Sequence, residues 1–329
     1  MNVLITGVAG LLGSRLADYL LEKKDINVIG IDDFSGGYIE NVNAKVTLYK
    51  YCIGKDDIEN VFKKHQIDYV FHFAAYAAEC LSPFIRKYNY QSNLIATADI
   101  INNCIKYNIK RLIFTSSLAV YGNQAPPFDE SLIPDPQDPY GVSKYACELD
   151  IKIAGNQHGL DWCILRPHNV YGAKQNIWDK YRNVFGIWMY QYINNEPMTI
   201  FGDGLQTRAF SLIDNSLPAF WNAAILPQAS KQIINVGSKT HTSIKDACEI
   251  VKKVIGGGTI IYKEARHEVK NAYVTWQKSV DILHYEERFN LEEGVSFMWE
   301  WAKEQPKRKQ FQWDVYELND KIYSYWKIK

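Results

Sequence analysis

The sequence has no excess of charge of either sign. Its 329 residues include 37 Lys and Arg and 37 Asp and Glu, so the formal net charge is zero. Without a basic stripe or a polybasic cluster, the chain lacks the attraction that binds nucleic acids or anionic membrane surfaces. We therefore expect neither as a partner, although single basic residues can still bind a small anionic molecule.

Patterns typical of metal sites and membrane spans are also missing. The six cysteines form no Cys-x-x-Cys motif and no His/Cys metal spacing, which predicts free thiols, a reducing compartment and no metal. There is no leader-like N-terminal pattern, and no apolar run reaches the roughly 18 residues that span a bilayer. We expect a cytoplasmic protein, and its 47% hydrophobic residues are enough for one large domain or two closely packed ones.

Strand-like and helix-like segments alternate through the first half of the chain. This order predicts an α/β fold with a doubly wound parallel sheet. The expected strands are 2–6, 27–31, 46–51, 69–73, 111–115 and 162–166, and the expected helices are 11–23, 57–65, 89–107 and one from Tyr140. A proline-rich segment, 126–139, is expected to be an ordered loop.

A glycine turn follows the first expected strand and opens the first expected helix. In Thr6-Gly7-Val8-Ala9-Gly10-Leu11-Leu12-Gly13, the early glycines let the backbone approach a pyrophosphate, and the helix N-terminus attracts its charge. Asp32 and Asp33 end the second strand, where a carboxylate can accept hydrogen bonds from the adenosine ribose. A carboxylate there disfavours the extra phosphate of NADP, so the predicted cofactor is NAD.

The most informative residues are Tyr140 and Lys144. Four residues apart on a helix, they share one face. Tyrosine titrates near pH ~10, so a role as general base requires its pKa to fall by roughly three units, which an adjacent lysine cation can supply. Ser117, just beyond the strand 111–115, can hydrogen-bond both the Tyr140 phenol and a substrate oxygen. The three side chains predict an acid/base site at the edge of the sheet.

These motifs, with several others, resemble the extended short-chain dehydrogenases/reductases, specifically nucleotide-sugar epimerases of the UDP-glucose 4-epimerase type. The resemblance covers nearly the full length. Beyond the glycine turn, the matching segments are 71–75 (FHFAA), 116–122 (SSLAVYG), 139–144 (PYGVSK), 165–172 (LRPHNVYG) and 201–204 (FGDG) leading to Arg208.

The resemblance implies a role for each matched residue. The implied catalytic residues are Ser117, Tyr140 and Lys144. The implied cofactor-binding residues are Gly7, Gly10, Leu11, Leu12, Gly13, Asp32, Asp33, Ile53, Phe73, Ala74, Ala75, Tyr76, Asn93, Ser116, Tyr140, Lys144 and Pro167. The implied substrate-binding residues are Ser117, Asn169, Asn183, Val184, Phe201, Arg208, Arg266 and Tyr273, with the two arginines on the pyrophosphate.

The resemblance also implies a reaction and an organisation. Hydride leaves C4 of a UDP-hexose for NAD and returns to the other face of a 4-keto sugar, while Tyr140 takes the hydroxyl proton. The expected domains are an NAD-binding Rossmann domain, 1–167 with a later contribution near 209–240, and a smaller mixed α/β substrate-binding domain, 168–329. The family further implies a homodimer. The aromatic tail from about 307 could cover the fold or join two subunits.

Some positions depart from the family pattern. Cys52 replaces an Asp near the adenine, and Tyr76 and Glu79 lie in a loop that varies with substrate, where they touch the sugar or cap the next helix. Tyr273 matches a position that limits the space for the C2 substituent, so its bulk predicts a hydroxyl there rather than an N-acetyl group. His168 either lines the pocket or is packed as an ordinary buried histidine.

Other functions were weighed. A 4,6-dehydratase needs an acid/base pair where this chain has Leu118 and Ala119, so dehydration is not expected. A uronic-acid epimerase or decarboxylase stays open, because Arg182 or another basic residue could bind the carboxylate, as does another nucleotide-sugar-modifying enzyme of the same family. A non-catalytic NAD-binding regulator is disfavoured by the retention of Ser117, Tyr140 and Lys144.

Overall fold

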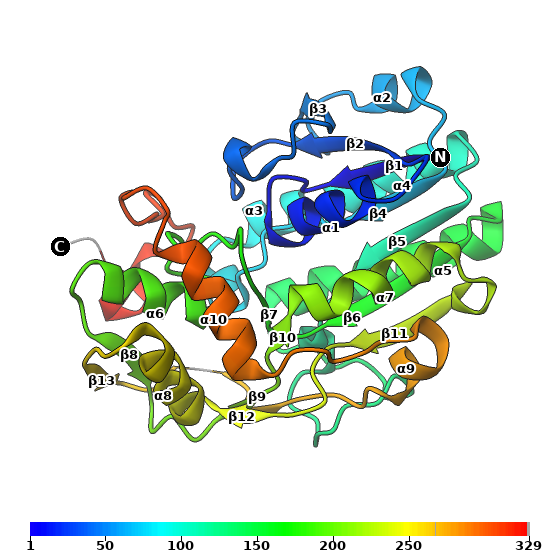
Figure 1. The fold of residues 1–329 in the computed structure, drawn as a ribbon. Coiled ribbons are helices and arrows are strands. Elements are labelled where there is room, and N and C mark those ends of the chain that lie inside the picture. Colours follow the sequence, from blue (N-terminus) through cyan, green and yellow to red (C-terminus); the bar gives the residue numbers. More distant parts are fainter. Residues whose placement is uncertain (267, 328–329) are drawn as a thin grey trace.

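A seven-stranded parallel sheet lies at the centre of the fold (Figure 1). The computed structural model describes residues 1–266 and 268–327. The sheet has the order β11-β6-β5-β4-β1-β2-β3. Its strands are β1 (Asn2–Thr6), β2 (Asn27–Asp32), β3 (Thr47–Lys50), β4 (Tyr69–His72), β5 (Arg111–Thr115), β6 (Trp162–Pro167) and β11 (Gln232–Val236). This topology confirms the predicted doubly wound sheet, with its switch point between β1 and β4, where ligands bind in such folds.

Helices cover both faces of the sheet, as the alternation of side chains along its strands requires. In β1, Val3 and Ile5 join one apolar core and Leu4 joins the other. The first core includes residues of α1 (Leu11–Leu21) and α7 (Ile213–Ile225). The second includes residues of α2 (Glu59–Lys64), α4 (Ala96–Lys106) and α5 (Pro139–His158). Both faces of the sheet are therefore buried, which accounts for its nearly continuous apolar strands.

A smaller mixed region follows β6 and has its own apolar core. Trp188, Val251 and Met298 come from three helices of this core, α6 (Val184–Ile193), α8 (Ile244–Ile255) and α10 (Leu291–Ala302). The helices accompany a pair of parallel strands, β8 (Met198–Phe201) and β13 (Ile260–Lys263). Shorter strands complete the region: β7 (Val170–Tyr171), β9 (Thr207–Arg208), β10 (Ser211–Leu212), β12 (Thr242–Ser243) and β14 (Asn271–Ala272).

Two helical segments complete the sheet side of the fold. Helix α9 (Gln277–Leu283) lies beside α7 and β11, and α3 (Arg86–Tyr90) continues through a π-helical turn, Gln91–Ile95, into α4. A short 3-10 segment, Glu79–Phe84, precedes α3. The division of the chain at residue 167 stays a prediction.

The aromatic tail packs against the fold. Trp313, Tyr316, Tyr323 and Trp326 form an apolar cluster with residues of 76–88, and Phe311 pairs with Asp179 in a β-bridge. This packing corresponds to the first of the two roles weighed for the tail, covering the body of the fold. The last two residues of the predicted tail, Ile328 and Lys329, lie outside the described residues, as does His267. No helix within 1–266 and 268–327 is long and apolar enough to cross a membrane.

Candidate active site

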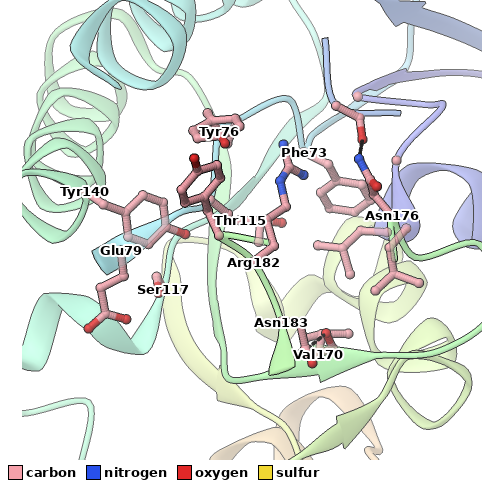
Figure 2. A pocket seen from close by; sticks show the side chains of 18 of the residues that line it. Phe73, Tyr76, Glu79, Thr115, Ser117, Tyr140, Val170, Asn176, Arg182 and Asn183 are labelled. Carbon is pink, nitrogen blue, oxygen red and sulfur yellow. Dashed lines mark hydrogen bonds between the residues drawn. The ribbon is translucent and has the colours of Figure 1, made fainter. Parts of the chain in front are cut away.

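A cavity of about 460 Å³ lies at the carboxyl ends of the sheet strands and extends into the smaller region (Figure 2). Most of the predicted site residues line it. Those contributed by the sheet side are Gly7, Gly10, Leu11, Leu12, Gly13, Asp32, Asp33, Ile53, Phe73, Ala74, Ala75, Tyr76, Ser116, Ser117, Tyr140, Lys144 and Pro167. Those contributed by the later segments are Asn169, Asn183, Val184, Phe201, Arg208 and Arg266.

The glycine turn forms one wall of the cavity. Gly7 has φ +70°, and a Cβ on Gly13 would lie 2.2 Å from the Gly7 carbonyl oxygen, so both positions require glycine. Gly10 caps α1, whose first turn contains no acidic residue. The N-terminus of α1 therefore offers backbone donors and a positive dipole end to the cavity.

Asp32 fixes the shape of this wall. Its carboxylate accepts hydrogen bonds from the backbone amides of Ala9 (2.9 Å) and Phe34 (2.8 Å). Burial raises the pKa of this carboxyl, and the two amide bonds oppose that rise. Asp32 thus ties the glycine turn to the end of β2 and also faces the place where an adenosine ribose is expected. Together, the turn and this carboxylate fit NAD.

Asn93 is the one predicted cofactor residue that does not line the cavity. It is buried, its Oδ1 accepts a hydrogen bond from the Tyr76 amide (2.8 Å), and its Nδ2 donates to Asn89 Oδ1 (2.8 Å). Asn93 therefore supports the cavity wall from behind, because it fixes the backbone of the loop after β4.

The predicted catalytic residues meet at one end of this wall. Figure 2 shows the Tyr140 phenol and Ser117 directed into the same part of the cavity. Tyr140 comes from the first turn of α5, which Asp138 caps by accepting from the Gly141 amide (3.0 Å). The Lys144 ammonium lies 6.0 Å from the centre of the Tyr140 ring and donates to the Thr115 carbonyl oxygen (2.8 Å).

The electrostatics of this group differ from the expectation for Tyr140. Burial raises the pKa of the phenol, and the Ser117 hydroxyl and the Arg182 charge oppose that rise. Burial lowers the pKa of Lys144 to about 8. The expected fall in the Tyr140 pKa is not seen in the protein alone, because burial penalises the phenolate and Lys144 is not among the main groups that lower this pKa.

A buried ion pair holds Ser116, the neighbour of Ser117. The Arg166 guanidinium donates to both carboxylate oxygens of Glu148, at 2.9 and 2.6 Å, and the Ser116 hydroxyl donates to the same carboxylate (2.5 Å). The pair joins β6 to α5 and the end of β5, the two elements next to which the catalytic residues lie.

Two arginines line the part of the cavity that the later segments contribute. The Arg266 guanidinium stacks 4.1 Å above the Phe201 ring, and Arg208 donates to Glu268 (3.2 Å). Asn183 caps α6 by accepting from the Phe185 amide (3.0 Å), and Asn169 has φ +40°. This part of the cavity has the cations and backbone groups that a diphosphate requires.

Tyr273 lies apart from these groups. It stacks on His241, with ring centroids 4.1 Å apart, and it does not line the cavity. Tyr273 directly follows β14 and lies outside the cavity lining. This geometry gives no support to the prediction that Tyr273 limits the space for the C2 substituent. His168 is fully buried beneath Gly237, as the packed alternative predicted.

Some residues that line the cavity were not predicted from the sequence, and others were named only as alternatives. Gly36 and Gly37 lie in the loop after β2, and Glu79 and Arg182 project into the cavity. The paired glycines next to Asp33 were a usable signal. Arg182 lies in an irregular segment, 172–183, where sequence periodicity carries no information.

The comparisons agree with this geometry. Residues 3–237 match the model of the NAD dependent epimerase/dehydratase family. A UDP-glucuronate 4-epimerase of Thermodesulfobacterium geofontis is 31% identical over 326 residues, covering 92% of this chain and 96% of the relative.

Two solved structures are similar to this chain over more than nine tenths of its length. A UDP-glucose 4-epimerase of Thermotoga maritima, solved with UDP-glucose, has a TM-score of 0.87 at 30% identity and covers 92% of this chain and 98% of its own. A UDP-N-acetylglucosamine 4-epimerase of Methanobrevibacter ruminantium, solved with UDP-N-acetylmuramic acid, has a TM-score of 0.83 at 30% identity, covering 91% and 97%. The resemblance to nucleotide-sugar 4-epimerases and the prediction of an NAD-dependent enzyme are confirmed. The chain belongs to the NAD dependent epimerase/dehydratase family.

Proposed function

We propose that this chain interconverts UDP-galactose and UDP-glucose by inverting C4 of the sugar. The observation that carries the proposal is the placement of Ser117, Tyr140 and Lys144 between the glycine-turn wall and the Arg208–Arg266 end of one cavity. A nucleotide sugar whose diphosphate contacts the arginines extends its sugar toward the phenol. The solved relative with UDP-glucose supports this choice of substrate.

The residues have separate tasks in this reaction. The glycine turn and Asp32 would hold NAD, which would supply reversible hydride transfer at C4 of the sugar. Ser117 holds the sugar oxygen at C4, and Tyr140 takes its proton and later gives it back. Lys144 keeps a positive charge beside Tyr140 below pH about 8, which favours the phenolate during proton transfer. The arginines retain the diphosphate while the 4-keto sugar turns over.

Glu79 favours a neutral sugar over a uronate. Its carboxylate faces the cavity beside Ser117 and Tyr140 (Figure 2), and burial together with the Asp138 charge raises its pKa. A uronate carboxylate placed here would raise the pKa of Glu79 further, so binding it would require this acid to take up a proton. A sugar hydroxyl can instead donate a hydrogen bond to Glu79.

We also propose that the enzyme is a homodimer. Val142, Leu149 and Ile153 of α5 are 42%, 43% and 50% exposed, and their spacing places them along one side of the helix. Ile95, just before the adjacent α4, is 47% exposed. An apolar stripe of this kind is suited to a symmetric contact between two copies. A cytoplasmic location stays a prediction.

The test is to incubate the purified protein with UDP-galactose and NAD and to follow UDP-glucose by proton NMR. UDP-galacturonate and UDP-N-acetylgalactosamine are run in parallel. Conversion of UDP-galactose alone is expected. Conversion of UDP-galacturonate alone would contradict the role of Glu79, and no conversion of any sugar would contradict the epimerase.

The matched variants are Tyr140→Phe and Tyr145→Phe, since Tyr145 lies on the same helix outside the cavity lining. Tyr140→Phe should lower turnover about 100- to 10,000-fold while NAD still binds, because only the proton acceptor is lost. Tyr145→Phe should retain turnover. Equal activity of the two variants would remove Tyr140 from the mechanism.

A further inference from the structure

The cavity must accommodate two diphosphates, one in NAD and one in the proposed substrate. Among the described residues that line it, the basic side chains are Lys144, Arg182, Arg208 and Arg266. Arg208 and Arg266 lie together at the substrate end, where both approach Glu268. Lys144 lies at the catalytic end, bonded to Thr115. Arg182 is the remaining cation.

Arg182 lies against the cofactor wall. Its Nη2 is so close to Gly36 that a Cβ added there would lie 2.4 Å away, and Gly37 packs on the Ala9–Gly10 step of the glycine turn in the same way. Asn176 ties this segment to the same loop by donating to the Gly36 carbonyl oxygen (3.1 Å). The guanidinium therefore contacts Gly36, and the next residue, Gly37, contacts the glycine turn at the N-terminus of α1.

Arg182 is close enough to both ends of the cofactor wall to act on a group at each. Its contact with Gly36 places it beside the loop after Asp32, and, against the burial that raises them, its charge lowers the pKa of both Asp32 and Tyr140. In NAD, the diphosphate lies between the adenosine and the nicotinamide. A cation that lines the cavity between these two ends is within reach of that diphosphate.

The guanidinium is oriented by protein groups on one side and open on the other. Its Nε lies 3.0 Å from Asp179 Oδ2, and its plane lies 4.7 Å from the centre of the Tyr76 ring. Trp313 donates to the Tyr76 hydroxyl (3.0 Å), and that hydroxyl donates to Asp179 (3.4 Å). Within 1–266 and 268–327, no hydrogen bond engages the two terminal nitrogens, which face the cavity.

We propose that Arg182 binds the diphosphate of NAD, as a cofactor residue that complements the glycine turn. The N-terminus of α1 supplies only a partial positive charge, whereas a guanidinium supplies a full one and can donate two parallel hydrogen bonds to phosphate oxygens. Asp179 and Tyr76 hold the fork in place, which reduces the ordering needed on binding. The assignment rests on NAD as the cofactor and is independent of which sugar is turned over.

The experiment measures binding by calorimetry to protein freed of nucleotide, with three probes: NAD, ADP-ribose and adenosine. Arg182→Gln should weaken NAD and ADP-ribose alike, by about tenfold to a hundredfold, because both contain the diphosphate. Adenosine, which has no phosphate, should bind as to the unaltered chain. Arg182→Lys, which keeps the charge, should recover part of the loss.

Lys180→Gln is the matched control, since it removes a cation two residues away that does not line the cavity. It should leave all three affinities unchanged. Unchanged NAD and ADP-ribose binding by Arg182→Gln would overturn the proposal. Equal weakening of adenosine would show a general disruption of the site, which also overturns it. None of these results depends on whether UDP-galactose is converted.

Discussion

Burial acts in opposite directions on the acids and bases of this molecule, and single residues show the effect most clearly. It raises the pKa of Tyr140 and lowers that of Lys144 to about 8, so in the protein alone the phenol stays protonated near neutral pH while the ammonium keeps its charge. The positive nicotinamide ring of bound NAD would shift this balance toward the phenolate. The acid/base chemistry of the pair is therefore a property of the loaded site.

His72 gives a prediction for stability at low pH. Its ring is fully buried, with Nδ1 2.7 Å from Thr6 Oγ1 and Nε2 3.0 Å from Thr97 Oγ1, and burial lowers its pKa to about 3. The unfolded chain protonates this histidine near pH ~6.5 but the folded chain does not, so stability is lost as the pH falls below that value. Between pH 7.5 and 5, His72 should account for a loss of about 2 kcal/mol.

Urea unfolding at the two pH values measures this loss. The variant His72→Asn should be less stable at pH 7.5, because it loses hydrogen bonds, yet its stability should depend less on pH. The control His158→Asn removes an exposed histidine at the end of α5 and should retain the full pH dependence. If both variants show the dependence of the unaltered chain, His72 is not its source.

Sequence patterns predicted the site residues well where a local turn or helix sets their spacing. The glycine turn and the Tyr140–Lys144 spacing are consequences of a turn and a helix, so their positions followed directly. Arg182 could not be found in the same way, because only a tertiary contact with Gly36 brings it to the cofactor wall. Tyr273, which does not line the cavity, illustrates the related point that the path of a loop, and not its sequence alone, decides which side chains face the site.

At the level of elements, the ion pair between Glu148 and Arg166 joins three parts of the sheet side. The side chains are 0% and 1% exposed, so neither charge can be solvated if its partner is removed. Glu148→Gln should lower the free energy of unfolding by about 3 to 5 kcal/mol, because Arg166 then keeps a buried, uncompensated charge.

The measurement is urea unfolding, with Glu300→Gln as the control. Glu300 forms an ion pair of the same length, 2.6 Å, with Lys303 on the surface, and exposed pairs contribute at most about 1 kcal/mol. Comparable losses for the two variants would show that burial adds nothing to the internal pair.

Most helices and strands of the sheet followed from periodicity, but α7, α9 and α10 did not. Helix α7 contains Pro218, which reads as a helix breaker, and α10 contains Gly294. Gly294 is required by packing, since a Cβ there would lie 2.2 Å from the Tyr171 hydroxyl. Such tertiary needs override local propensity and leave no periodic signal.

For the whole molecule, the apolar stripe on α5 predicts the oligomeric state. The double substitution Leu149→Glu with Ile153→Glu should convert the dimer into a monomer, because it places charges in a contact that would otherwise exclude water. Light scattering coupled to size-exclusion chromatography measures the mass. Ile133→Glu, which changes an 81% exposed residue of the proline-rich loop, should leave it unchanged. A monomeric mass for the unaltered chain would refute the dimer.

The contact between Trp313 and Tyr76 joins residues 237 positions apart in the sequence. During synthesis, all seven strands of the central sheet, β1 to β6 and β11, leave the ribosome before Trp313 emerges. The nucleotide-binding wall can therefore assemble on a nascent chain, whereas the support for Tyr76 and Asp179 can form only near the end of translation. A ribosome stalled before residue 307 would hold a chain whose sheet is complete while Tyr76 and Asp179 still lack their contacts with the tail.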